Sequence, residues 1–482
     1  MADTAVAGAI SAPRRTLRWF LAIEALCLVG FGVFLWRGDQ AVAFLFLVGP
    51  LQILIFALLA RADYWLLFSF AALLPATALE LLPLKYAHVV LYTGTLGLLL
   101  FLRMTRFVIP KQVPSASGLA TVERIPLVIL ATWIVLAGVN ATLRGWGSTD
   151  LLYYTVVGLE VLLVTWFFAV VPQSLRQVRA LVYAMAATYA VVCCLLPFLA
   201  SRVVGGFLGK TLETPFAVVN LNVFATHVGV FAVVVIGAFL DSERTLGKLV
   251  LSVVFIILLA TLLFTKSRGA WLGFGIAFLY ILVRTRSFWL LVPAGTAILG
   301  LLSLDILRIG VLARVGQTTT QDPSLWGRLL LWKYAWDIFK GNWLFGVGIE
   351  NFRFVKHFFG FPWPRYFGVA FNTHNIFLEV LVDLGVVGFA SFLWLTIGTF
   401  LRVDRIVRVP SAKSKGLAIG LNAAIIVYAV HGLMDCVIWQ HGAFMLLGVL
   451  LGLSMSVHRL GSGLTGAGIA PRLNQLSSAP GH

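Results

Sequence analysis

The sequence predicts an all-α polytopic membrane protein, and three observations lead to this fold class. Of the 482 residues, 60% are hydrophobic and only 11% are charged. The mean hydropathy is +0.97, which lies far outside the range of soluble domains. The apolar residues also gather in long runs, and a hydrocarbon core of roughly 30 Å needs about 20 such residues for each helix. These observations exclude a soluble globular protein and predict 12–14 transmembrane helices.

The apolar runs follow one another along most of the chain. The first run comes after Arg14, Arg15 and Arg18 and is too long for the core of a signal peptide, so we expect an uncleaved first span. The runs at 88–102 and 270–283 are the shortest. The 14 candidate segments are 18–36, 41–60, 64–84, 88–102, 125–142, 151–171, 180–200, 216–240, 249–265, 270–283, 287–306, 375–401, 416–431 and 441–458.

The basic residues indicate how the spans are oriented. The formal net charge is +17, and most Lys and Arg residues lie at the ends of apolar segments, which is typical of membrane topology and not of nucleic-acid binding. With the N-terminus in the cytoplasm, the cytoplasmic segments carry 21 Lys and Arg residues and the short outer loops carry seven. We therefore expect both termini in the cytoplasm. The expected parts are N-terminal transmembrane helices (1–306), a large outer loop (307–373), C-terminal transmembrane helices (374–460) and a disordered cytoplasmic tail (461–482).

The large outer loop is basic, although topology does not require positive charge there. It holds eight Lys and Arg residues against Asp322, Asp337 and Glu350. Within it, the stretch from Leu325 to Phe339 has a helical repeat rich in Trp and Tyr, residues that favour a membrane interface. We expect an amphipathic helix near the outer leaflet. The alternative is a lid that packs on the bundle and has no chemistry of its own.

Two further basic sites face the same side of the membrane. The first is the turn Lys266-Ser267-Arg268-Gly269. Because only 15 residues separate Arg268 from Arg284, Arg268 is expected below the headgroups, where charged groups are costly and tend to be functional. The alternative is an arginine that reaches up to the interface. The second site is the glycine-containing loop after the seventh span, which carries Arg202.

A histidine opens the most regular local pattern. The residues spaced along one expected helical face are His374, Leu378, Leu381, Gly385 and Gly388. Small residues on that face allow close packing against another membrane helix. A histidine at the outer end can remove a proton from a hydroxyl near neutral pH; the alternative is an interfacial or capping residue.

Other candidate residues complete this picture. Asp435 is expected in an outer loop, where its carboxylate could orient a basic partner or bind a sugar hydroxyl. The four cysteines have neither a Cys-x-x-Cys spacing nor a histidine cluster nearby, so neither a disulfide framework nor a metal site is expected. No nucleotide-binding or hydrolase motif on a credible turn is present.

Four short motifs in this order resemble the O-antigen ligase and polymerase superfamily, and within it most closely the ligases. The motifs are Thr265-Lys266-Ser267-Arg268-Gly269-Ala270-Trp271-Leu272, Gly327-Arg328 followed by Trp332, the stretch Leu344 to Phe352, and the run from His374-Asn375 to Gly388. The resemblance implies an inverting glycosyltransferase of the bacterial inner membrane with its active site in the periplasm and no metal or other cofactor. It implies transfer of a glycan from undecaprenyl pyrophosphate to lipid A-core.

The resemblance also implies roles for individual residues. Arg268 and Arg328 correspond to arginines that bind the pyrophosphate, and His374 corresponds to the general base. The expected substrate-binding residues are Arg202, Lys266, Arg268, Arg328, Asn375 and Asp435.

Three other functions remain open. An O-antigen polymerase uses the same donor with a lipid-linked glycan as acceptor. A protein O-oligosaccharyltransferase is less favoured because no soluble domain is expected after residue 460. A transporter of lipid-linked glycans would line its path with the arginines, but the basic groups gather on one side and no internal repeat is visible.

Overall fold

The computed structural model describes residues 64, 67–68, 70–72, 74, 121–147, 149–199, 202–205, 210–213, 218–286, 323–355, 372–409, 414–435 and 441–466. The chain divides into two compact units, and every element named below belongs to the second one, Ala72–Leu81 and Pro114–His482. The expected spans at 18–36, 41–60, 88–102 and 287–306 lie outside the described residues, as does the tail after residue 466.

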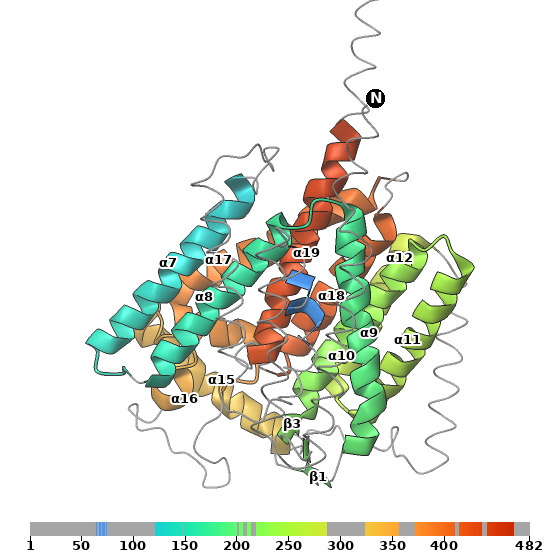
Figure 1. The fold of residues 1–482 in the computed structure, drawn as a ribbon. Helices are drawn as coiled ribbons and strands as arrows, with labels where there is room; N and C mark the ends of the chain where they lie inside the picture. The colour runs from blue at the N-terminus through green and yellow to red at the C-terminus, as the bar shows by residue number, and fades with distance from the viewer. Residues whose placement is uncertain are drawn as a thin grey trace, which may run out of the picture. The chain divides into compact units, whose positions relative to one another are not determined.

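Helices dominate the described residues (Figure 1). Eight of them are long and apolar enough to cross a membrane, counted over the described residues alone. The expected polytopic helical fold is confirmed. The short segment expected at 270–283 is a helix of 18 residues and is not among these eight. The helices are α7 (Thr121–Leu143), α8 (Thr149–Val170), α9 (Leu175–Leu199), α10 (Leu221–Leu240), α11 (Thr245–Phe264), α12 (Arg268–Thr285), α15 (Pro323–Gly341), α16 (Phe352–Val355), α17 (Ile376–Val407), α18 (Lys415–Gly432) and α19 (His441–Gly466).

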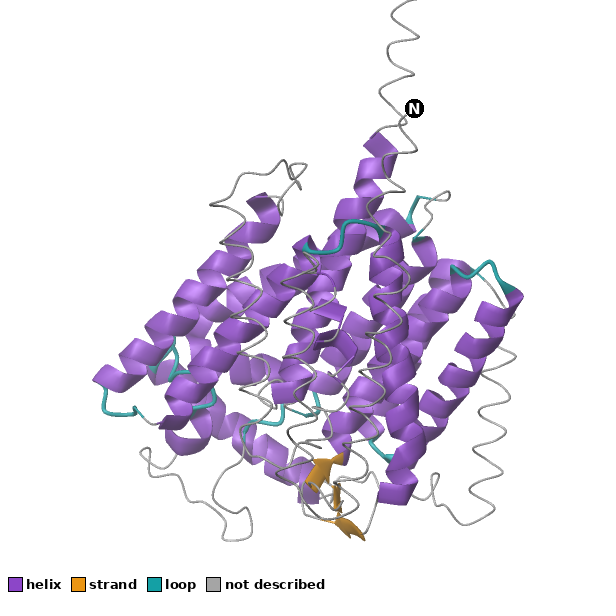
Figure 2. Cartoon of the chain, viewed as in Figure 1, coloured by secondary structure: helices purple, strands orange, loops and turns teal. Residues whose placement is uncertain are grey.

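A small antiparallel sheet precedes α10 (Figure 2). Its order is β1 (Arg202–Gly205), β2 (Lys210–Glu213), β3 (Val218–Asn220). The expectation that 216–240 forms one continuous span was therefore wrong at its start. The helix begins at Leu221 because the Asn220 side chain caps it, accepting hydrogen bonds from the amides of Asn222 (2.9 Å) and Val223 (3.4 Å).

Glycines allow α18 to approach α10 closely. A Cβ added to Gly237 of α10 would lie 2.5 Å from the Gly416 carbonyl oxygen and 2.7 Å from the Gly420 Cα. Small residues spaced four apart are a usual means of close helix packing in membranes. Asp241 fixes the same contact, since its carboxylate accepts hydrogen bonds from the amides of Gly416 (2.7 Å) and Leu417 (3.0 Å).

Glycines also allow α12 to pack closely against α18. A Cβ on Gly273 would lie 2.9 Å from the Val427 carbonyl oxygen, and one on Gly269 would lie 2.7 Å from Cδ2 of His431. The beginning of α12 is thereby held against the end of α18.

Helix α17 breaks at Gly385, which has φ of 67° and ψ of −172°. The expected single helical face from His374 to Gly388 therefore does not continue past Gly385. The chain segment before α16 makes backbone hydrogen bonds to α17 on both sides of the break. The amide of Val347 donates to the Val382 carbonyl (3.0 Å), and the amide of Val386 donates to the Trp343 carbonyl (2.8 Å). The stretch 344–352 and the break are one structural unit.

Glycine is required at this break. A Cβ on Gly385 would lie 2.2 Å from the Leu344 carbonyl oxygen, and one on Gly346 would lie 2.3 Å from the Asp383 carbonyl oxygen. The fully buried side chain of Asp383 accepts hydrogen bonds from the amides of Glu350 (2.7 Å) and Phe352 (3.3 Å). Acidic residues of α17 thus satisfy backbone donors that a bilayer could not.

Helix α15 lies at the same end of the bundle as the sheet (Figure 1). One of its faces is buried through Leu331, Tyr334, Ala335 and Ile338, against a core that includes Val347. Other positions are exposed, among them Trp326, Leu329 and Trp336. The helix therefore packs on the bundle through one face, and its other face retains the large apolar side chains expected of an interfacial helix.

Candidate active site

The structure joins two of the predicted site residues. Nδ1 of His374 lies 2.8 Å from Oδ1 of Asp435, although the two are 61 positions apart in the chain. Both residues are buried, with 9% and 6% of their surface exposed. His374 lies directly before the cap of α17, with a left-handed φ of 51°. Such a conformation in a residue other than glycine is strained and often marks a functional site.

The hydrogen bond with Asp435 sets the chemistry of the imidazole. Because the carboxylate is an acceptor, the Nδ1 of His374 carries the hydrogen and Nε2 carries the lone pair. Burial alone would raise the pKa of Asp435, but His374, through its charge when it is protonated and through its hydrogen bond, and then the charge of Arg328 hold that pKa below its ordinary value. The carboxylate stays ionised and can stabilise an imidazolium ion.

Neighbouring groups fix the backbone around His374. The Asn375 side chain caps α17, accepting hydrogen bonds from the amides of Phe377 (3.0 Å) and Leu378 (3.1 Å). The buried Glu379 accepts a hydrogen bond from the amide of Thr373 at 2.6 Å. The cap gives Asn375 a structural role, and substrate binding by this residue stays a prediction.

Helix α15 brings its arginine to the same place. The indole Nε1 of Trp332 donates to the carbonyl of Thr373 at 2.9 Å, so α15 is tied to the residue before His374. Arg328 lies one turn earlier on α15, and its charge acts on Asp435. The second and fourth sequence motifs therefore converge on one site.

The turn before α12, which leads to Arg268, is the third part of the candidate site, after the His374–Asp435 pair and α15. Lys266 has a left-handed φ of 56°, Ser267 occupies the cap position and Arg268 is the first helical residue. The Oγ of Ser267 lies 3.4 Å from Nε2 of His431. Since Asp435 follows His431 by four residues, the turn that carries Arg268 and the turn that carries Asp435 lie against the same residue. Arg202 opens β1, and its role stays a prediction.

Sequence reasoning missed the residues that connect these parts. His431 was not assigned a role, although it precedes Asp435 by one helical turn, a spacing that allows contact. The Oγ1 of Thr226 lies 2.7 Å from Nδ1 of His431. Nothing in the sequence around Thr226 indicates this contact, because the residue lies within an apolar run. Among the described residues, no group of three or more His, Cys, Asp or Glu side chains could hold a metal ion.

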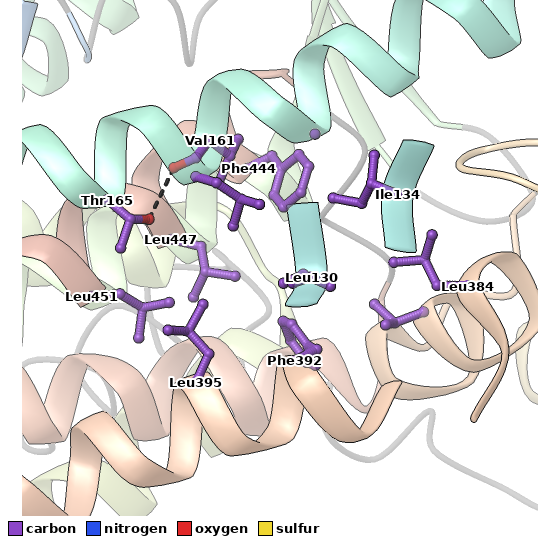
Figure 3. Close-up of a pocket in the computed structure, with 13 residues that line it drawn as sticks. Leu130, Ile134, Val161, Thr165, Leu384, Phe392, Leu395, Phe444, Leu447 and Leu451 are labelled. Atoms are coloured by element: carbon purple, nitrogen blue, oxygen red, sulfur yellow. Dashed lines mark hydrogen bonds between the residues drawn. The ribbon is translucent and has the colours of Figure 1, made fainter. Parts of the chain in front are cut away.

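An apolar pocket lies among α7, α8, α17 and α19 (Figure 3). Leu130, Leu384, Phe392 and Phe444 are among its lining residues, and none of the lining side chains is ionisable. The hydroxyl of Thr165, also in the lining, donates to the Val161 carbonyl of its own helix at 2.9 Å. The pocket therefore offers no group for acid–base chemistry, in contrast to the His374–Asp435 pair.

The fold and the site together define a multi-pass membrane protein with a buried histidine–carboxylate pair beside two arginine-bearing helices. Residues 253–393 match a family model described as O-antigen ligase. This region contains Arg268, Arg328 and His374, and it ends before Asp435.

Two curated proteins are similar to this chain. One is named "Putative polysaccharide ligase" and comes from Rickettsia conorii; it is 22% identical over 260 residues, which cover 52% of this chain and 61% of that protein. A protein with the same description from Rickettsia felis is 22% identical over 243 residues, covering 49% of this chain and 58% of its own length. The chain thus spans about three-fifths of these relatives. The matches show that part of this chain is similar to O-antigen ligase-type proteins.

Proposed function

We propose that the protein is an O-antigen ligase. It transfers a glycan from undecaprenyl pyrophosphate to a sugar hydroxyl of lipid A-core at the periplasmic face of the bacterial inner membrane, with both termini in the cytoplasm. The observation that carries the proposal is the buried His374–Asp435 pair, set against the helices that bear Arg268 and Arg328. The family match supports the same assignment.

His374 acts as the general base in this proposal. Its Nε2 accepts the proton of the acceptor hydroxyl while the oxygen attacks the anomeric carbon. The bond from that carbon to the pyrophosphate breaks on the opposite face, so the configuration inverts. Asp435 stabilises the imidazolium ion that forms, at a distance of 2.8 Å. A positioned base typically accelerates such a step by about 10²- to 10⁴-fold.

Arg268 and Arg328 bind the leaving group. Undecaprenyl pyrophosphate departs with negative charge, and cations fixed near that charge lower the barrier. A guanidinium stays charged and can bind two phosphate oxygens at once, which an ammonium group cannot do in the same geometry. Lys266, two residues before Arg268, adds a point charge on the same turn.

The decisive experiment is deletion of the gene in its native host, followed by a lipopolysaccharide gel and extraction of lipid-linked glycans. For a ligase, the long-chain ladder disappears and full-length glycan accumulates on undecaprenyl pyrophosphate. A core that carries a single repeat would instead identify the polymerase, and an unchanged ladder would contradict both.

Complementation of the deletion strain distinguishes loss of catalysis from loss of the protein. The wild-type gene is expected to restore the ladder. His374→Ala, expressed at the same level in the membrane, is expected not to restore it. Full restoration by His374→Ala would refute the role of His374 as the base.

A further inference from the structure

His431 lies at the end of α18 and is almost fully buried. Its two ring nitrogens contact two different helices: Nδ1 lies 2.7 Å from Oγ1 of Thr226 on α10, and Nε2 lies 3.4 Å from Oγ of Ser267 at the start of α12. Its own carbonyl accepts a hydrogen bond from the amide of Asp435 at 3.0 Å. One residue thus contacts both turns that carry candidate site residues.

The direction of these hydrogen bonds follows from their partners. The hydroxyl of Thr226 donates to the carbonyl of Asn222 at 3.2 Å, so its oxygen is free to accept the hydrogen on Nδ1 of His431. The lone pair of His431 is then on Nε2, where it accepts the hydrogen of the Ser267 hydroxyl. The imidazole is a neutral bridge with one donor and one acceptor.

Ser267 is used in an unusual way. A serine at the cap position of a helix normally accepts a hydrogen bond from an amide of the first turn, but the Ser267 side chain makes no such bond. Its hydroxyl faces His431 instead. The preceding Lys266 holds a left-handed φ of 56°, so the turn that leads to Arg268 depends on contacts from outside the helix.

We propose that His431 is a positioning residue for the transfer reaction. Through Nε2 its side chain holds the Ser267 turn, and thereby Arg268. Its backbone carbonyl accepts the hydrogen bond of the Asp435 amide, so the imidazole holds the Arg268 turn against the turn that carries Asp435. Gly269 permits this contact, since a Cβ there would lie 2.7 Å from Cδ2 of His431. His431 touches neither substrate; it sets the distance between the pyrophosphate-binding group and the base. This proposal rests on the proposed function.

The test uses two substitutions that keep different halves of the bridge. Glutamine places its amide near the position of Nε2, and asparagine places it near that of Nδ1. His431→Gln is therefore expected to retain most of the activity. His431→Asn keeps the contact with Thr226 and loses the contact with Ser267. Its kcat/KM for the lipid-linked donor is expected to fall by about 10- to 100-fold, because small misplacements of a binding group have effects of that order.

Matched variants separate positioning from simple stability. Thr226→Val removes the shorter hydrogen bond of the same imidazole and is expected to lower the melting temperature with little change in donor KM. Ser267→Ala is expected to reproduce the His431→Asn defect. The double variant Ser267→Ala/His431→Asn should be no worse than either single variant, because both remove one contact. If His431→Asn does not fold, Ser267→Ala alone carries the comparison.

The measurements are initial rates of transfer by the purified full chain in lipid nanodiscs, with varied donor. Wild-type donor KM and kcat in both His431→Asn and Ser267→Ala would overturn the proposal. An equal loss of kcat/KM in Thr226→Val and His431→Asn would also overturn it, in favour of a purely structural histidine. Failure of the proposed function looks different: the wild-type protein would then transfer no glycan, or His374→Ala would remain active.

Discussion

Replacement of Asp435 by asparagine tests the histidine–carboxylate pair. The substitution keeps the size of the side chain and removes its charge. Asparagine can still contact the Nδ1 of His374, which the carboxylate meets at 2.8 Å. It cannot stabilise the imidazolium ion that forms when the acceptor loses its proton. We expect kcat for glycan transfer to fall while the donor KM stays close to the wild-type value.

The geometry sets the size of this effect. Two opposite charges about 4 Å apart interact by about 4 kcal/mol at an effective dielectric constant of about 20. Since about 1.4 kcal/mol corresponds to a tenfold change in rate, the loss in kcat is about 10³-fold. This value lies inside the range of about 10²- to 10⁴-fold that general-base catalysis typically provides.

The assay is the rate of transfer by purified protein at saturating donor and acceptor. Asp241→Asn is the matched control, because Asp241 is a carboxylate that accepts hydrogen bonds from the amides of Gly416 and Leu417. This control should lower the melting temperature and leave kcat unchanged. An Asp435→Asn enzyme with wild-type kcat would refute the assignment of Asp435 as the partner of the base.

Three further predictions concern binding, folding and pH. Arg268→Lys keeps the charge but removes the planar guanidinium, which can bind two phosphate oxygens, so kcat/KM for the donor should fall by about 10-fold or more. Rates of glycan transfer at varied donor concentration measure this change. Gly385→Ala should strongly lower the melting temperature, because φ is positive and the new Cβ would lie 2.2 Å from the Leu344 carbonyl oxygen. The lowered pKa of Asp435 should stabilise the fold at every pH above about 4, the value in the unfolded chain, and this contribution should be lost as the pH falls below it.

Each of these predictions has its own control and refuting result. A wild-type rate in Arg268→Lys would show that a point charge is enough. Gly275→Ala is the control for Gly385→Ala, since nothing lies within 4 Å of a Cβ at Gly275; equal melting temperatures in the two variants would contradict the argument. For pH, the melting temperatures of wild type and Asp435→Asn should differ at pH 5, and the part of this difference that comes from the Asp435 carboxylate should disappear as the pH falls below about 4. Convergence above pH 5 would contradict it.

Hydropathy predicted the helices well because the bilayer imposes a simple rule. Every backbone group inside it needs an internal partner, so a long apolar run can only be a helix. The expected segments at 125–142 and 441–458 correspond to α7 and α19 for this reason. The rule fails where protein replaces lipid as the surroundings. Gly385 was expected within one helical face, but partners from a distant segment allow the helix to break there.

The candidate site was predictable only in part. The sequence could propose His374, Arg268 and Arg328 as candidates because the motifs that carry them are local in sequence. Contacts between distant residues leave no such pattern, so His431 and its bonds to Thr226 and Ser267 needed the three-dimensional structure. The sequence indicated only that the Asp435 carboxylate could orient a basic partner, and the three-dimensional structure identifies His374 as that partner.

The break in α17 determines how this protein could be divided and recombined with its relatives. The carbonyls of Val382 and Asp383 receive hydrogen bonds from the amides of Val347 and Gly348. A chimera that exchanged only residues 307–373 would separate these donors from the acceptors they evolved with. An exchange intended to preserve the fold should therefore run past Gly385 and take the loop and the first half of α17 as a single inherited block.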